Sequence, residues 1–131
     1  MSRQYETGNR WEQLTANLFR ANGYEVWQSR GSKSAADLIA IKRGDIVLVQ
    51  VKRCSRPNPE TSQIIGGDEW NTLYDLAAHL DAQPVLADWG GIRGTRAVLR
   101  LRRLIGRHTP GTRFWPMIPF RLDFAEEEAG A

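Results

Sequence analysis

Apolar residues along the chain change their spacing several times, and each spacing predicts an element. Between residues 9 and 22 they recur at helical intervals, at Trp11, Leu14, Leu18 and Phe19, and Gly23 supplies a stop. The same pattern predicts a second helix over residues 68–81. Short apolar runs predict strands over residues 24–29, 84–89 and 95–104.

The stretch from Ser34 to Lys52 indicates two apolar strands folded back at Arg43-Gly44. A two-residue turn closed by Lys42 and Asp45 places Asp37 opposite Gln50, and the strand period of two puts Lys52 on the face of Gln50. Both faces of this hairpin are apolar. We therefore expect it at the centre of a sheet, covered on both sides.

The rest of the chain contains more breakers. Residues 53–67 are expected to be an irregular linker, residues 90–94 a turn, and residues 110–124, with three prolines, a segment that wraps around the core or a partner. The order α-β-β-β-α-β-β predicts an α/β fold with a mixed central sheet flanked by helices. We expect one domain over residues 1–131, with a core at about 8–124 and an acidic, flexible tail at 125–131.

The net charge of +3 conceals a strong segregation along the chain. Residues 1–57 carry +5, residues 58–90 carry −6, residues 91–124 carry +7, and the tail carries −3. This pattern favours a basic surface for a polyanion, with the two basic segments together and the acidic segment facing away. A basic surface that serves solubility alone is the alternative.

Two other features narrow the class of protein. Cys54 is the only cysteine, so neither a disulfide nor a cysteine-built zinc site exists within one chain. Neither a signal-peptide pattern at the start nor an apolar run of the roughly 20 residues that span a bilayer is found. We expect a cytoplasmic protein, in the host cytoplasm if a phage encodes it, without a membrane or small-molecule cofactor. His79 and His108 are expected on the solvated surface.

Candidate chemistry lies at the open end of the hairpin. Asp37, Gln50 and Lys52 converge there, and an acid, an amide and a lysine in this arrangement favour a divalent cation and a phosphodiester. Glu12 lies on the flank of the apolar stripe of the first helix and could reach over the edge of the sheet. A plain surface glutamate is the alternative.

These residues resemble the motifs of the PD-(D/E)xK nucleases and, among them, the archaeal and phage Holliday-junction resolvases. The resemblance covers roughly residues 8–105 and implies a restriction-endonuclease-like fold. It lies in five segments: Gly8-Asn9-Arg10-Trp11-Glu12-Gln13, Gly23-Tyr24, Arg30-Gly31-Ser32, Asp37 and Gln50-Val51-Lys52.

The resemblance also implies roles for single residues. Glu12, Asp37, Gln50 and the carbonyl of Val51 would hold Mg²⁺, for which Mn²⁺ would substitute, and Lys52 would act on the attacking water or the phosphorane. DNA would be bound by Arg30, Ser32, Lys33 and Arg53. The family usually has an acid where this chain has Gln50, so the set Glu12, Asp37 and Gln50 carries −2 rather than −3.

The expected function is a Mg²⁺-dependent endonuclease that resolves four-way junctions by paired symmetrical nicks. A homodimer would match the twofold symmetry of the junction, and the aromatic residues of segment 110–124 would supply its interface. Two alternatives stay open. One is a non-catalytic DNA-binding relative with a decayed metal site, and the other is a restriction or repair nuclease with the same core.

Overall fold

The computed structural model describes residues 3–29, 34–92 and 94–123, with side chains from residue 9 onward. Two helices and six strands make up the fold, and a short 3₁₀ turn spans Thr61–Gln63. The elements are α1 (Arg3–Ala21), β1 (Glu25–Gln28), β2 (Leu38–Lys42), β3 (Asp45–Cys54), α2 (Gly67–His79), β4 (Gln83–Gly90), β5 (Val98–Leu104) and β6 (Met117–Pro119).

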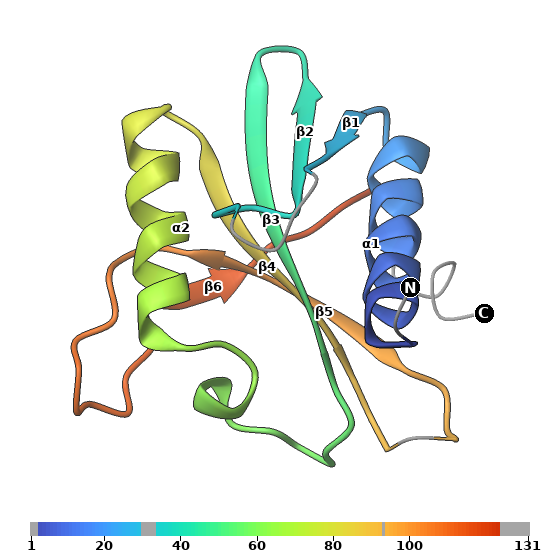
Figure 1. Ribbon diagram of the computed structural model, residues 1–131. Helices are drawn as coiled ribbons and strands as arrows, with labels where there is room; N and C mark the ends of the chain where they lie inside the picture. The colour runs from blue at the N-terminus through green and yellow to red at the C-terminus, as the bar shows by residue number, and fades with distance from the viewer. Residues whose placement is uncertain (1–2, 30–33, 93, 124–131) are drawn as a thin grey trace.

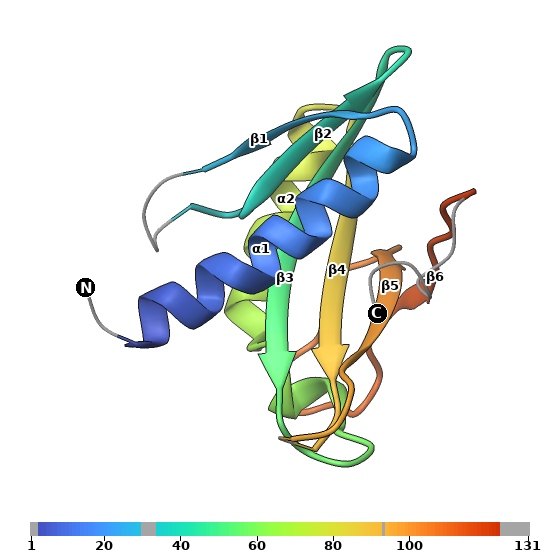
Figure 2. The ribbon, with the colours of Figure 1, turned by 90° about the vertical axis from the view of Figure 1, so that its right-hand side faces the viewer.

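The strands form one mixed sheet in the order β1-β2-β3-β4-β5-β6. β3 and β4 run parallel, as Figure 2 shows, and every other neighbouring pair is antiparallel. A parallel pair needs a crossover connection, which the segment containing α2 provides between β3 and β4. The predicted α/β fold with a mixed central sheet is confirmed.

The predicted hairpin register is also confirmed. Lys42 pairs with Asp45 and Leu38 pairs with Val49, so the two strands meet as the two-residue turn requires. The turn residues Arg43 and Gly44 have φ angles of 51° and 85°. Positive φ at both central residues gives a turn whose twist matches that of the flanking strands.

The helices cover opposite faces of the sheet (Figure 1). α1 packs Leu18 and Phe19 against inward residues of β2 to β5, and α2 packs Trp70 and Leu73 against Leu48 and Leu86. β3 is therefore covered on both sides, as expected. β2 is not, because Ile39 on the α2 side is 36 % exposed.

Several predicted boundaries differ from the structure. α1 begins at Arg3 rather than residue 9, and β3 continues to Cys54, inside the predicted linker. The segment 110–124 adds a strand that the predicted order lacks, since β6 pairs with β5. His108 is buried rather than solvated, and its ring stacks on Trp115 with 3.5 Å between centroids.

The expectation that the acidic segment faces away from the basic segments is wrong. Glu69 pairs with Lys52, Asp75 with Arg107, and Asp88 with Arg100 and Arg102. In the folded protein, acidic side chains of residues 58–90 thus form ion pairs with basic side chains of residues 1–57 and of residues 91–124. Within the described residues, neither helix combines the length and the apolar character that crossing a membrane requires.

Candidate active site

Asp37 directly precedes β2, at the end of its pairing with β3. Its backbone N–H donates to the Val49 carbonyl at 2.8 Å, and its Oδ2 accepts the N–H of Val51 at 2.8 Å. The carboxylate thus takes the place that a strand backbone would occupy beside β3. Because one oxygen is tied to the backbone, the carboxylate is held in position while its other oxygen is left to a ligand.

Glu12, on α1, lies close enough to this carboxylate for the two charges to interact. Both acids are partly buried, and burial is the main cause that raises the pKa of each. The negative charge of Asp37 raises the pKa of Glu12 further, while the Gln28 amide opposes this rise. For Asp37, the Val51 N–H and the Lys52 ammonium lower the pKa, and Glu69 raises it. The charges of Glu12 and Asp37 therefore interact, and the role of Glu12 at the site stays a prediction.

Gln50 and Lys52 come from consecutive positions on one face of β3. Gln50 is 8 % exposed, and its amide makes no hydrogen bond to another described residue. Lys52 is partly exposed, and its Nζ donates to Glu69 Oε2 at 2.6 Å. Val51 lies between them and gives its N–H to Asp37. The four side chains that the sequence singled out thus converge on the middle of β3.

Glu69 is a member of this cluster that the sequence did not reveal. It lies in the first turn of α2, where a negative charge interacts favourably with the helix dipole. Because this local role explains an acid at position 69, no sequence pattern indicated its contact with Lys52. It belongs to the acidic segment expected to face away. The connection between β3 and α2 brings it back over the end of the strand, a placement that only tertiary structure decides.

The donor set suits a hard divalent cation. Two partly buried carboxylates repel each other across the site, and an amide without a hydrogen-bond partner among the described residues lies beside them. Oxygen donors of these kinds are ligands of Mg²⁺. No group of three His, Cys, Asp or Glu side chains placed to hold a metal occurs in the described part of the chain. The site has two acids, Glu12 and Asp37, because position 50 holds an amide and not a third acid.

The residues expected to bind DNA can be followed only in part. Arg30, Ser32 and Lys33 lie outside the described residues. Arg53 donates its Nη1 to the Gly91 carbonyl at 3.1 Å and the Trp89 carbonyl at 3.3 Å, and its guanidinium lies 5.2 Å from the Trp11 ring centre. Arg53 therefore joins the end of β3 to β4 and α1, and its contact with DNA stays a prediction.

Comparison with known proteins agrees with this geometry. The described fold resembles that of the Holliday junction resolvase Hjc from Archaeoglobus fulgidus, with a TM-score of 0.59 and 19% sequence identity over 72% of this chain and 70% of the other. No curated protein sequence matches the chain. Residues 4–83, which include Glu12, Asp37, Gln50 and Lys52, match the restriction endonuclease family Mrr_cat. The chain therefore belongs to this family of nucleases of the PD-(D/E)xK type.

Proposed function

We propose that the protein is a Mg²⁺-dependent, structure-selective DNA endonuclease of the cytoplasm that resolves four-way junctions by paired symmetrical nicks. The observation that carries this proposal is the meeting of Glu12 and Asp37, from α1 and the start of β2, beside Gln50 and Lys52 of β3. The likeness in fold to a protein described as a Holliday junction resolvase favours branched DNA over other substrates.

Each side chain has a role that its surroundings support. Asp37 offers the oxygen that Val51 does not engage, and Glu12 and Gln50 offer further oxygen ligands, together with the carbonyl of Val51. Lys52, whose ammonium lies at the opening of the site, would steady negative charge on the phosphate under attack and orient the water that attacks it. Bound Mg²⁺ would supply Lewis acidity toward the phosphate and the water.

Cleavage of labelled DNA tests the proposal directly. A panel of four-way junction, flap, linear duplex and single strand is incubated with and without Mg²⁺. We expect metal-dependent product, with the junction cut fastest and at symmetrical positions. Asp37→Asn and Lys52→Ala should each lower the rate by a factor of about 10² or more. Both variants should still bind the junction, because branch shape and phosphates are recognised apart from the chemistry.

Asp45→Asn is the matched control for Asp37→Asn. Asp45 is an exposed acid at the turn of the same hairpin, far along β3 from the site, so its loss should leave the rate unchanged. Three results would count against the proposal. A preference for linear duplex would favour a restriction-type nuclease, and binding without metal-dependent product would favour a non-catalytic relative. Wild-type rates in both Asp37→Asn and Lys52→Ala would show that the site is wrong.

A further inference from the structure

A second charged cluster lies beside the candidate active site, around a fully buried acid. Asp88 of β4 has no exposed surface, and its Oδ2 accepts hydrogen bonds from two arginines of β5. Arg100 donates to it from Nη2 at 2.6 Å and from Nε at 3.2 Å, and Arg102 donates from Nη2 at 2.8 Å. Burying a carboxylate costs free energy, and pairing it with arginines offsets this cost but adds little net stability. Stability alone therefore does not explain the cluster.

The cluster carries more positive than negative charge. One carboxylate faces two guanidinium groups, and burial together with the charge of Arg100 lowers the pKa of Arg102. Asp88 Oδ1 and Arg102 Nε are buried without a hydrogen-bond partner among the described residues. An additional anion placed against Arg100 would therefore relieve the repulsion between the two arginines.

Sheet register places this cluster next to the catalytic lysine. Lys52 is the neighbour of Asp88 across β3 and β4, and Asp88 is the neighbour of Arg100 across β4 and β5. Neighbours in register project from the same face, so the three side chains form one row. Two strand spacings separate Lys52 from Arg100, which is a distance of about 10 Å between their backbones.

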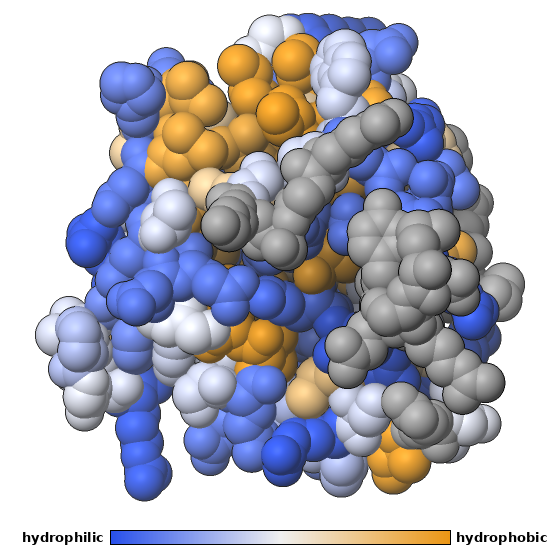
Figure 3. All heavy atoms as spheres, viewed as in Figure 1, coloured by the Kyte–Doolittle hydropathy of each residue, from blue (hydrophilic) through white to orange (hydrophobic). Residues whose placement is uncertain are grey.

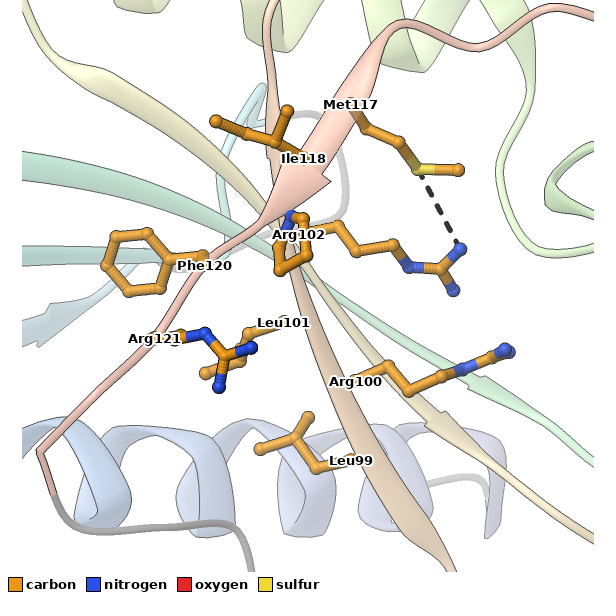
Figure 4. Close-up of a pocket in the computed structure, with 9 residues that line it drawn as sticks. Leu99, Arg100, Leu101, Arg102, Met117, Ile118, Phe120 and Arg121 are labelled. Atoms are coloured by element: carbon orange, nitrogen blue, oxygen red, sulfur yellow. Dashed lines mark hydrogen bonds between the residues drawn. The ribbon is translucent and has the colours of Figure 1, made fainter.

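Only one of the two arginines is open to a large ligand. The side chain of Arg100 is 42% exposed, whereas that of Arg102 is 17% exposed and also contacts the Met117 sulfur. Figure 4 shows both arginines extending to the same side of β5, with Arg121 and Phe120 on the other side of a pocket of about 500 Å³. Asp88 and Arg102 thus form the buried part of the cluster, whereas the guanidinium of Arg100 is exposed at the surface.

We propose that Arg100 binds a backbone phosphate of the DNA strand that enters the active site, a few nucleotides from the phosphate at Lys52. The inference rests on the proposed function, since it needs DNA at the site. A DNA strand carries a phosphate about every 3.4 Å along the helix axis, so a strand at Lys52 brings further phosphates to within the reach of Arg100. A guanidinium held by Asp88 on one edge still has donors on its other edge for a phosphate.

Binding of a fluorescent four-way junction without divalent metal tests this role, because no cleavage then interferes. Arg100→Gln removes the charge, and Arg103→Gln is its matched control, since Arg103 is an exposed arginine of β5 that projects from the opposite face. Affinity is measured between about 50 and 200 mM salt, the range in which phosphate contacts have the largest effect. A thermal unfolding curve for each variant checks that it is folded.

For Arg100→Gln we expect weaker binding and a salt dependence (log affinity against log salt concentration) that is shallower by about 0.9, the value for one lost phosphate contact. Arg103→Gln should keep the wild-type dependence. Arg100→Lys keeps the positive charge but loses the planar guanidinium, which donates to Asp88 from two nitrogens. It should therefore show the wild-type salt dependence and an affinity between those of the wild type and Arg100→Gln. If Arg100→Gln does not fold, the affinity of Arg100→Lys carries the test, and an affinity equal to that of the wild type would contradict the proposal.

Two outcomes would overturn the proposal, and they are distinguishable. If the wild type binds with a steep salt dependence and Arg100→Gln does not change it, Arg100 contacts no phosphate and the proposed nuclease function stands. An equal loss in Arg100→Gln and Arg103→Gln has the same meaning, since a general charge effect then explains both. If the wild type does not bind the junction at all, this inference falls together with the proposed function.

Discussion

A buried amide at position 50 determines the charge of the candidate site. Gln50 is 8 % exposed and lies on β3 between Leu48, in the core under α2, and Lys52, at the opening. Burial and, after it, the negative charge of Asp37 raise the pKa of Glu12, so the two acids already repel each other there. A third acid would increase this repulsion without metal, and an amide avoids it. We therefore expect the departure from the usual motif to lower metal affinity and to favour the stability of the metal-free protein.

Gln50→Glu tests this exchange. We expect the metal-free variant to be less stable by about 1–2 kcal/mol, since it adds a carboxylate to a partly dry site with two others. Its affinity for Mg²⁺ should rise about tenfold, because ligand charge sets the affinity of oxygen sites. Thermal unfolding with increasing Mg²⁺ measures both effects, because a ligand of the folded state raises the midpoint.

The control for this substitution is Gln83→Glu, which adds the same charge at the start of β4, away from the site. It should leave the response to Mg²⁺ unchanged. In cleavage assays we expect Gln50→Glu to reach its maximum at a lower Mg²⁺ concentration, with at most a modest change in maximal rate. If Mg²⁺ raises the thermal unfolding midpoints of Gln50→Glu and of the wild type equally, Gln50 is not a ligand of the metal.

At the scale of elements, α2 holds the connection that leads to β6. Asn71 binds the backbone of His108 twice, since its Nδ2 donates to the carbonyl at 3.0 Å and its Oδ1 accepts the N–H at 2.8 Å. Trp70 donates from Nε1 to the Gly106 carbonyl at 2.9 Å. The ring of His108 stacks on Trp115, just before β6. A helix on one side of the sheet thus fixes the strand at its edge.

Asn71→Ala should therefore destabilise the protein by about 1–3 kcal/mol, the range for partly buried polar groups that lose their partners. Urea unfolding measures the loss. Thr72→Ala, at the next position of α2, changes an exposed residue and should have little effect. Equal stabilities of the two variants would show that the connection is held by its aromatic stacking instead.

The elements also show what the sequence could predict. Local patterns determined the hairpin: two strands, a two-residue turn and alternation were sufficient for its register, which brings Asp37 beside β3, where it accepts the N–H of Val51. β6 was missed because it is short and contains Pro119, and its pairing with β5 outweighs the poor strand propensity of its sequence. The contact of Glu69 with Lys52 and the pairs of Asp88 depend on chain crossings that no local pattern encodes.

At the scale of the whole molecule, part of the segment expected to form a dimer interface packs within the chain. Trp115 packs against Trp70, and Phe120 stacks on Phe19 across the other core. Phe114 and Ile118 of the segment stay 71% and 43% exposed, and a second exposed apolar pair lies on the sheet, where Trp27 (53% exposed) and Ile39 (36% exposed) are directly paired between β1 and β2. In Figure 3, hydrophobic residues gather over the upper part of the molecule and hydrophilic residues over its middle.

A homodimer, which we propose, would use the face of β1 and β2 on the α2 side, where two exposed apolar side chains of neighbouring strands are paired. Light scattering at tens of micromolar protein in moderate salt should give twice the monomer mass, and Trp27→Ser should shift it toward the monomer. Ile118→Ser, which changes an exposed apolar residue of β6, is the control and should leave the mass unchanged. A wild-type monomer both with and without DNA would contradict the dimer.

The central place of β3 has a consequence for how the protein fluctuates. β3 is bonded to β2 on one side and to β4 on the other, and both helices pack over it. Amide hydrogens in such a strand exchange with solvent only when the whole domain opens, whereas those near chain ends exchange through local opening. We therefore expect slow exchange along β3, including its site residues, where β4 pairs with Gln50 and Lys52 and the Asp37 carboxylate holds the Val51 N–H. The part of the site that this strand carries should then keep its backbone shape until the domain itself opens.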